Sequence, residues 1–386
     1  MGNTPPPIFC RVREYRKRKG LSQEALATLV GLRRQAVYDM EAGRYLPNTA
    51  VALRLAAILG CTVEMLFCEE PCCETGLVHI LGEPSDTVAA EYAPTRLALA
   101  RVRSRLVGIP LHSRATAPAN TPGGLDLPFS LPLSDGHMAE DGTLHLHLHQ
   151  SRLENTTLVL GCDPALSLLT GLVSGRSPSL RAHTAFASSR KALLALASGH
   201  THLAATHFHG DTNGNIAALQ EVCPHLPCLV VSFSTQEEGL MVAEGNPLGI
   251  RSVADLAESP VRLVNREKGA ALRRLLDSLL EKDGIPSGCV CGYEREVLSH
   301  SEGALQVAKG MADAALGLRV VAAAFSLGFV SLATTRCDLV VPTDLCRHQG
   351  VSALLDCVQS AALRREMDAL PGYDSGATGK IVPYSS

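Results

Sequence analysis

The sequence has no tryptophan and only 8 phenylalanines and 7 tyrosines among 386 residues. A core with so few aromatic rings must be filled mainly by leucine, alanine and valine, which suits helices packed on parallel strands better than a β-sandwich. Hydrophobic residues make up 46% of the chain and charged residues 19%, a composition typical of soluble globular proteins. We therefore expect two or three domains, the largest of them α/β.

Segments that direct a chain to a membrane or out of the cell are also missing. The start, MGNTPPPIFC, has no basic stretch leading into an apolar run, and Pro6 stands where a myristoylation motif needs Ser or Thr. The most apolar stretch, 314–333, is interrupted by Arg319 and Gly328, which is not typical of a membrane span. Thirteen cysteines are too sparse for a disulfide scaffold. We expect a cytoplasmic protein with reduced thiols.

The net charge of -3 is unevenly distributed. Residues 1–68 contain ten Lys or Arg and five Asp or Glu, whereas the rest of the chain contains 25 and 33. A basic segment on an acidic protein indicates that this segment alone meets a polyanion.

Residues 8–68, which we call the head, have the pattern of five short helices. Ser22 is a good N-cap for the second helix, Gly31 ends it, and a third helix is predicted from about Arg33 to Glu41. Two short helices joined by a glycine turn can place the second helix in the major groove of DNA. Its outward side chains would include Arg and Gln, which form paired hydrogen bonds with guanine and adenine.

The stretches GLSQEALA, RRQAVYDMEAG and LPN followed by LRLAAILG closely resemble the Cro/repressor (Xre-like) helix-turn-helix family. The alternative is a small helical bundle that binds protein, with solvated arginines. We interpret Arg16 to Lys19 as a solvated basic face. The resemblance implies that Gln23 contacts the DNA backbone or a base, that Arg33, Arg34, Gln35 and Tyr38 form the reading surface, and that Arg44 and Asn48 contact phosphates.

Residues 69–155, the connector, are rich in Pro, Gly and small polar residues and predict a linker with a small β-containing part. Cys68, Cys72 and Cys73 lack the second pair of ligands that a zinc site needs. The stretch LHLHLH places three histidines on one face of a strand, where they could hold zinc or nickel or form a polar, half-exposed face. The second interpretation is favoured, and we expect no metal and no cofactor. These histidines are His145, His147 and His149.

From residue 156 to 383, the body, apolar strand patterns alternate with helical ones. Alternation of this kind predicts parallel sheets with ligands at the carboxyl ends of the strands. The stretches GCDPAL, LASGHTHLAATH, VRLVNREKGAALRRLLD and GYDSGATG resemble the periplasmic-binding-protein superfamily, and within it the cytoplasmic molybdate-binding-like domains. The resemblance implies a type II fold: two α/β lobes, joined by crossing strands, that close on a ligand.

Ligand contacts are expected in the turns between strands and helices. Asp163, Ser188 and Ser189 have an alternative role as helix caps, one of the two histidines at 202 and 207 could be a core residue, and Arg266 could pair with Glu267 or Glu294. The expected contacts are Cys162, Asp163, Ser188, Ser189, His202, His207, Asn265, Arg266, Gly269, Tyr293, Ser299 and His300.

The sequence departs from the family after Arg266. Relatives usually carry hydroxyl side chains in this turn, but here the residues are Lys268, Gly269, Ala270 and Ala271. Molybdate or tungstate is therefore doubtful as the ligand, whereas another anion or a small acidic metabolite fits an Arg beside a helix start.

These observations predict a one-component transcription regulator rather than an enzyme. Its head would bind operator DNA, its body would sense a small molecule, and two copies would bind half-sites roughly 34 Å apart as a homodimer. One alternative is a regulator whose body only dimerises, with a filled cleft. Another is an enzyme on the same fold, although no nucleophile-and-base motif is visible.

Overall fold

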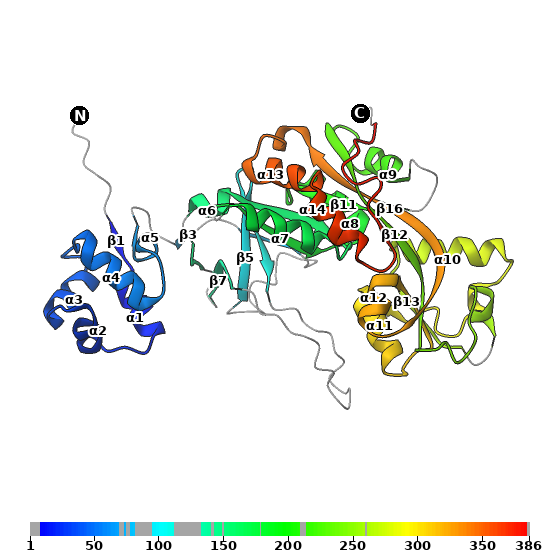
Figure 1. The fold of residues 1–386 in the computed structure, drawn as a ribbon, viewed down its shortest axis with the longest axis horizontal. Helices are drawn as coiled ribbons and strands as arrows, with labels where there is room; N and C mark the ends of the chain where they lie inside the picture. Colours follow the sequence, from blue (N-terminus) through cyan, green and yellow to red (C-terminus); the bar gives the residue numbers. More distant parts are fainter. Residues whose placement is uncertain are drawn as a thin grey trace. The chain divides into compact units, whose positions relative to one another are not determined.

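The protein is described from a computed structural model (Figure 1). The chain forms two compact units, Met1–Arg101 with Leu106–Glu154, and Val102–Arg105 with Asn155–Ser386. None of the helices in the described parts is both long enough and apolar enough to cross a membrane. The structure describes residues 8–68, 73–74, 78–81, 95–111, 133–139, 143–148, 150–177, 179–208, 214–258 and 261–383.

The head contains the five predicted helices. Ser22 accepts a hydrogen bond from the Ala25 amide at the start of the second, and Gly31, with φ of 78°, ends it. Two short strands, β1 (Phe9–Cys10) and β2 (Phe67–Cys68), pair antiparallel and join the two ends of the head, which the sequence did not predict. The helices are α1 (Val12–Arg18), α2 (Gln23–Val30), α3 (Arg34–Glu41), α4 (Thr49–Leu59) and α5 (Val63–Leu66).

The interpretation of residues 16–19 as a solvated face is wrong for Arg16. Its side chain is buried, and its Nε donates to Glu41 Oε1 at 2.5 Å. This ion pair joins α1 to the end of α3. Arg16 is therefore a structural residue of the head.

The connector contains a six-stranded sheet in the order β3-β8-β7-β5-β6-β4 and a short helix, α6 (Gln150–Glu154). Its described apolar core contains Leu97, Leu99, Leu106 and Leu153. The boundaries of the head and connector predicted from the sequence stay predictions. The strands are β3 (Cys73–Glu74), β4 (Val78–Ile80), β5 (Thr95–Val102), β6 (Arg105–Pro110), β7 (Gly136–Met138) and β8 (Leu144–Leu146).

The body has two lobes, each with parallel strands (Figure 1). Lobe 1 contains β9 (Thr156–Gly161), β10 (Arg181–Phe186) and β11 (Leu203–Thr206). An apolar cluster joins its sheet to three helices, and two further helices, α8 and α9, complete the lobe. The helices of lobe 1 are α7 (Leu166–Arg176), α8 (Ser189–Ala197), α9 (Gly214–Val222), α13 (Gln349–Val358) and α14 (Ala361–Asp368).

Lobe 2 contains the parallel strands β13 (Leu263–Arg266), β14 (Glu296–Val297) and β15 (Ala314–Leu318). One apolar cluster packs α10 (Ala271–Lys282) on its sheet through Leu272, Leu276 and Leu280. A separate cluster packs two other helices on the same sheet. These helices are α11 (His300–Ala308) and α12 (Arg319–Ala324).

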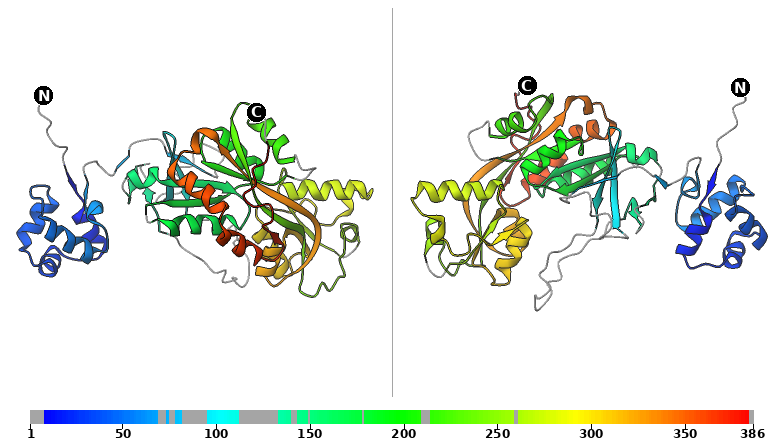
Figure 2. Two further views of the ribbon diagram at one scale, coloured as in Figure 1. Left: turned by 45° about the horizontal axis from the view of Figure 1, so that its top comes forward. Right: turned by 180° about the vertical axis from the view of Figure 1, so that it is seen from behind.

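Two long antiparallel strands, β12 (Cys228–Val242) and β16 (Gly328–Pro342), run from one lobe into the other (Figure 2). We call them the hinge strands. They are the crossing strands that the resemblance implies, and each is one continuous strand. A side chain on Gly239 would overlap the carbonyl oxygen of Val330, so only glycine fits at this position of β12. A third strand, β17 (Tyr373–Asp374), pairs with β12.

Candidate functional site

The predicted DNA-reading residues lie together at the start of α3. Arg33 is the N-cap residue, and Arg34, Gln35 and Tyr38 follow it, all with exposed side chains. Val37 and Met40, on the other face, are fully buried in the head. The helix therefore presents a polar, cationic face next to the glycine turn, as the major groove requires. Contact with DNA stays a prediction for each residue.

Intramolecular contacts already orient part of this face. Gln35 Nε2 donates to Asp39 Oδ1 at 3.2 Å, and the Arg44 guanidinium lies 3.2 Å from the same oxygen. The Arg44 guanidinium also lies 4.9 Å from the centre of the Tyr38 ring, within the range of a cation–π contact. These contacts hold Gln35, Tyr38 and Arg44 as one cluster.

Two of the predicted DNA contacts also have a structural role. Gln23 Nε2 donates to Glu41 Oε2 at 2.8 Å, so it joins the start of α2 to the end of α3. Asn48 Oδ1 accepts from the Val51 amide at 3.0 Å and caps α4. Burial by itself would raise the pKa of Glu41, but hydrogen bonds from Arg16 and Gln23 outweigh it, and the pKa lies below its ordinary value.

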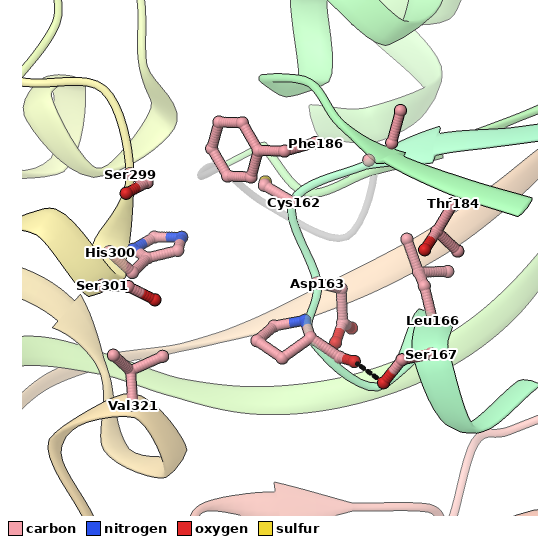
Figure 3. Close-up of a pocket in the computed structure, with 13 residues that line it drawn as sticks. Cys162, Asp163, Leu166, Ser167, Thr184, Phe186, Ser299, His300, Ser301 and Val321 are labelled. Carbon is pink, nitrogen blue, oxygen red and sulfur yellow. Dashed lines mark hydrogen bonds between the residues drawn. The ribbon is translucent and has the colours of Figure 1, made fainter. Parts of the chain in front are cut away.

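The body contains a pocket of about 200 Å³ between its two lobes (Figure 3). One side consists of the turn after β9 and the end of β10, where Cys162, Asp163 and Phe186 lie. The other side is the start of α11, with Ser299 and His300 (Figure 3). Its remaining lining residues are Gly161, Pro164, Leu166, Ser167, Thr184, Ala185, Ser301 and Val321.

A second cavity, of only about 10 Å³, adjoins the first through Cys162 and His300. A space of this size holds about one water molecule. Ala270, Ala271 and Leu272 at the start of α10 form part of its wall. The alanines that replace the expected hydroxyl residues therefore face this cavity without hydrogen-bond donors in their side chains. The other lining residues are Ser188, Ser189, His207 and Arg266.

Arg266, at the end of β13, is buried and held by several acceptors. Its Nε lies 3.0 Å from Glu267 Oε2, and NH2 donates to the Leu298 carbonyl at 3.0 Å. NH1 lies 3.1 Å from His300 Nδ1. The pairing with Glu267, which the sequence left open, is present here. Arg266 therefore positions the start of α11 as well as lining the small cavity.

His300 is the first residue of α11 and lines both cavities. Burial first, and then the positive charge of Arg266, hold the pKa of His300 well below its ordinary value. The imidazole is therefore uncharged at neutral pH, so it can donate or accept a hydrogen bond but adds no positive charge to the pocket.

Cys162, His207 and Glu238 form a row from the pocket to the hinge. Cys162 Sγ lies 3.5 Å from His207 Nδ1, and His207 Nε2 lies 3.5 Å from Glu238 Oε1. This order of thiol, imidazole and carboxylate is the order of a nucleophile, base and orienting group. Burial, however, raises the pKa of the Cys162 thiol far above its ordinary value. The thiol is protonated at neutral pH, so it is no nucleophile in this state.

Asp163 holds the turn before α7 and is not its N-cap residue, which is Ala165, and Ser189 makes a contact other than a helix cap. Asp163 Oδ1 accepts from the Ala165 amide at 2.8 Å, and Oδ2 accepts from Ser234 Oγ at 2.6 Å. Ser189 Oγ accepts from the His207 amide at 3.0 Å and so fixes the end of β11. Ser188 is the N-cap residue of α8 and makes no side-chain cap bond.

Four of the expected ligand contacts, His202, Asn265, Gly269 and Tyr293, line neither cavity. His202 precedes β11, whereas His207 follows it, so the two lie at opposite ends of the strand. The Leu158 amide donates to His202 Nδ1 at 3.0 Å in the core. Asn265 Nδ2 donates to the carbonyl of Tyr293 at 3.1 Å, and the Tyr293 hydroxyl donates to Asp277. Gly269, with φ of 91°, shapes the turn before α10.

The hinge strands contribute polar residues that sequence reasoning missed. Ser234, Gln236 and Glu238 alternate along β12, so their side chains share one face. Ser234 contacts Asp163, and Glu238 accepts from Thr335 Oγ1 at 3.1 Å while facing His207. Gln236 lies between them, and both of its amide atoms are buried without a hydrogen-bond partner in the described parts of the chain.

The histidines of the connector do not form the predicted row. Strand β8 ends at Leu146, so His147 lies beyond it, and His149 and Cys72 lie outside the described residues. His137 Nδ1 lies 2.9 Å from His147 Nε2, and the His137 and His145 rings stack at 4.9 Å. Within the described ranges, no group of three or more His, Cys, Asp or Glu side chains is arranged to hold a metal ion.

Comparison with protein families identifies both ends of the chain. The profile of the helix-turn-helix family matches residues 12–66, and that of the PBP superfamily domain matches residues 170–359. These matches confirm the helix-turn-helix head and the periplasmic-binding-protein-like α/β body that the sequence predicted.

Individual relatives extend this result. An uncharacterized HTH-type transcriptional regulator of Methanothermobacter thermautotrophicus is 49% identical over 49 residues, which cover 13% of this chain and 71% of the relative. The uncharacterized protein YvgK of Bacillus subtilis is 29% identical over 199 residues, or 51% of this chain. The match covers 64% of YvgK, so this chain spans less than two thirds of that relative.

Among solved structures, a putative phosphate ABC transporter substrate-binding protein from Clostridium perfringens, with bound phosphate, is similar to this chain with a TM-score of 0.44 and 12% identity. The superposition covers 55% of this chain and 97% of the other.

Proposed function

The chain belongs to the HTH-type transcriptional regulators, and from this premise we propose that it is a cytoplasmic, non-enzymatic regulator whose DNA binding responds to a small effector. The head would bind operator DNA as part of a homodimer. The body would bind the effector, an anion or small acidic metabolite, between its lobes. The eight predicted contacts that line the cavities are Cys162, Asp163, Ser188, Ser189, His207, Arg266, Ser299 and His300.

The proposal is supported mainly by the fact that residues of both lobes line the pocket. Phe186 and the Cys162 turn belong to lobe 1, whereas Ser299 and His300 belong to lobe 2. A ligand in contact with both sides stabilises the closed arrangement over the open one, because only the closed lobes offer all contacts at once. Closure bends the hinge strands and so provides a two-state element on which an effector can act.

DNA binding is tested with the full chain and duplexes from the region upstream of its own gene. We expect binding that weakens steeply with salt, because phosphate contacts release counterions. Replacing Arg34 and Gln35 by Ala should weaken specific binding by about tenfold or more, since each base-reading pair contributes roughly 1–3 kcal/mol. The control is Arg365→Ala, an equal charge change at an exposed site on α14 of the body.

The response to an effector is tested in the same assay by adding candidate anions and metabolites. A change in DNA affinity supports the proposal. Stabilisation of the body by a ligand with no change in DNA affinity contradicts the regulatory link, and the absence of specific DNA binding contradicts the role of the head.

The small cavity favours a second candidate function. The cavity beside Arg266, with Ala270, Ala271 and Leu272 in its wall, has a volume of only about 10 Å³. A body that serves only for dimerisation needs no larger ligand cavity. In that case the full chain is a dimer in sedimentation experiments, binds DNA, and shows no thermal shift with any anion.

A further inference from the structure

The pocket between the lobes has apolar side chains on both of its sides. Phe186, Leu166, Pro164 and Ala185 line it from lobe 1, and Val321 lines it from lobe 2. Phe186 is 50% exposed, a high value for a phenyl ring beside a cavity. In Figure 3 the ring lies on the lobe 1 side, across from Ser299, His300 and Ser301, and Val321 lies on the same side as these three. A ligand here would contact carbon on both sides and hydroxyl or imidazole groups at the start of α11.

The charges around the pocket are balanced or negative. Arg266 is the buried cation nearest to it, and Glu267 neutralises that charge at 3.0 Å. Asp163 and Glu238 add two buried carboxylates, the second facing His207. His300 is uncharged. A compact dianion such as molybdate or sulfate would therefore enter a site with no excess positive charge and with apolar side chains, and burying its charge there is costly.

A single negative charge, by contrast, would be stabilised at the start of α11. The helix start carries roughly half a positive elementary charge, and Ser299, His300 and Ser301 line the pocket at this point. Arg266 NH1 lies 3.1 Å from His300 Nδ1 and orients the imidazole. These groups suit a single carboxylate.

On the premise of the proposed function, we propose that the effector is a small organic monoanion: a monocarboxylate whose flat or cyclic apolar body packs on Phe186, Leu166 and Val321 while its carboxylate meets the start of α11. The pocket of about 200 Å³ exceeds what a tetrahedral oxyanion needs. Its apolar side chains give an organic body contacts that an inorganic ion cannot make. The hydroxyl groups of Thr184 and Ser167 also line the pocket, and the Ser167 hydroxyl donates to the Pro164 carbonyl.

The probes are benzoate and cyclohexanecarboxylate, with benzamide as an uncharged analogue of benzoate, and molybdate and sulfate as inorganic dianions. Binding to the full chain is measured by calorimetry and thermal shift. We expect both carboxylates to bind more tightly than benzamide and than either inorganic ion. Phe186→Ala should weaken benzoate by about tenfold, the equivalent of roughly 1.4 kcal/mol for a lost aromatic contact.

Leu194→Ala is the matched control, because Leu194 is a 49% exposed apolar residue of lobe 1 that does not line the pocket. Both positions are half-exposed, so neither change threatens folding. Tight binding of molybdate or sulfate with no binding of the carboxylates overturns this inference and leaves the proposed function intact. Equal binding of benzamide and benzoate, or an unchanged benzoate affinity in Phe186→Ala, also overturns it. Failure of the proposed function appears separately, as DNA affinity that no bound ligand changes.

Discussion

His207 Nε2 lies 3.5 Å from Glu238 Oε1, and the two side chains are 5% and 0% exposed. His207 follows β11 of lobe 1, whereas Glu238 lies on hinge strand β12, where the chain passes into lobe 2. The pair therefore joins the wall of the small cavity to the strand that runs from lobe 1 into lobe 2. Cys162 contacts His207 and lines both cavities. A ligand beside Cys162 would therefore be connected to hinge strand β12 through His207.

Glu238→Gln should destabilise the body by roughly 1–3 kcal/mol, because an amide cannot accept a hydrogen bond at both of the buried positions where the carboxylate oxygens meet Thr335 and His207. Glu237→Gln is the matched control on the same strand. Glu237 pairs with Arg319 at 2.8 Å, but both side chains are about a third exposed, so the expected loss is below about 1 kcal/mol. Urea unfolding of the full chain measures both changes. Equal losses for the two variants would show that the His207 contact adds nothing to stability.

Gln236→Met should raise the stability of the ligand-free protein by about 1 kcal/mol. Both amide atoms of Gln236 are buried without a hydrogen-bond partner in the described structure, and an unmade buried hydrogen bond is costly. Methionine has a similar length and no amide. Thermal unfolding checks this prediction. A loss of stability instead would indicate that an ordered water satisfies the amide.

The pKa of Glu41 predicts how the stability of the head changes at low pH. Its pKa in the folded head lies below the ordinary value of 4.5, so the folded state binds fewer protons than the unfolded state. The stabilisation is therefore complete above about pH 4.5 and is lost as the pH falls through the folded pKa. Glu41→Gln should remove this dependence and cost about 2 kcal/mol at neutral pH, because hydrogen bonds from Arg16 and Gln23 to a charge are lost.

Hydrogen exchange in peptides from residues 12–66 of the full chain measures the head separately from the body. If protection relative to the intrinsic exchange rate falls in parallel in wild type and Glu41→Gln between pH 6 and pH 3.5, the ion pair is not the acid-sensitive element.

Cys162 should react slowly with iodoacetamide at pH 7.5. Burial raises the pKa of its thiol far above the ordinary value, and only the thiolate reacts rapidly. Cys289 and Cys291, which are exposed, serve as internal references, and mass spectrometry gives all three rates in one sample. We expect Cys162 to be labelled at least tenfold more slowly. Faster labelling of Cys162 would mean that His207 activates it and would favour the enzyme alternative.

The head was predictable to the level of single caps because its signals are local. Ser22 and Gly31 mark the ends of α2 through their own backbone preferences. What local signals could not supply was the partner of each polar side chain. Arg16 was interpreted as a solvated residue, since nothing in the sequence indicates that Glu41 lies beside it in space.

The crossing strands were expected, but their polar residues were missed for a related reason. Residues 234–238 are Ser-Thr-Gln-Glu-Glu, which resembles a polar loop between two short strands. In the structure they continue β12, where Ser234 contacts Asp163 and Glu238 contacts Thr335 and His207. Likewise, the order of residues could not show that His202 and His207 occupy opposite ends of β11.

The pocket takes its walls from both lobes, and this has a consequence for time as well as for affinity. Under the proposed function, a ligand held between Phe186 and the start of α11 would lose half of its contacts when the lobes separate, a class of motion that takes microseconds to milliseconds. The rate of opening would then contribute to the rate at which the effector dissociates. The response to a fall in effector concentration would be delayed for as long as the lobes stay closed.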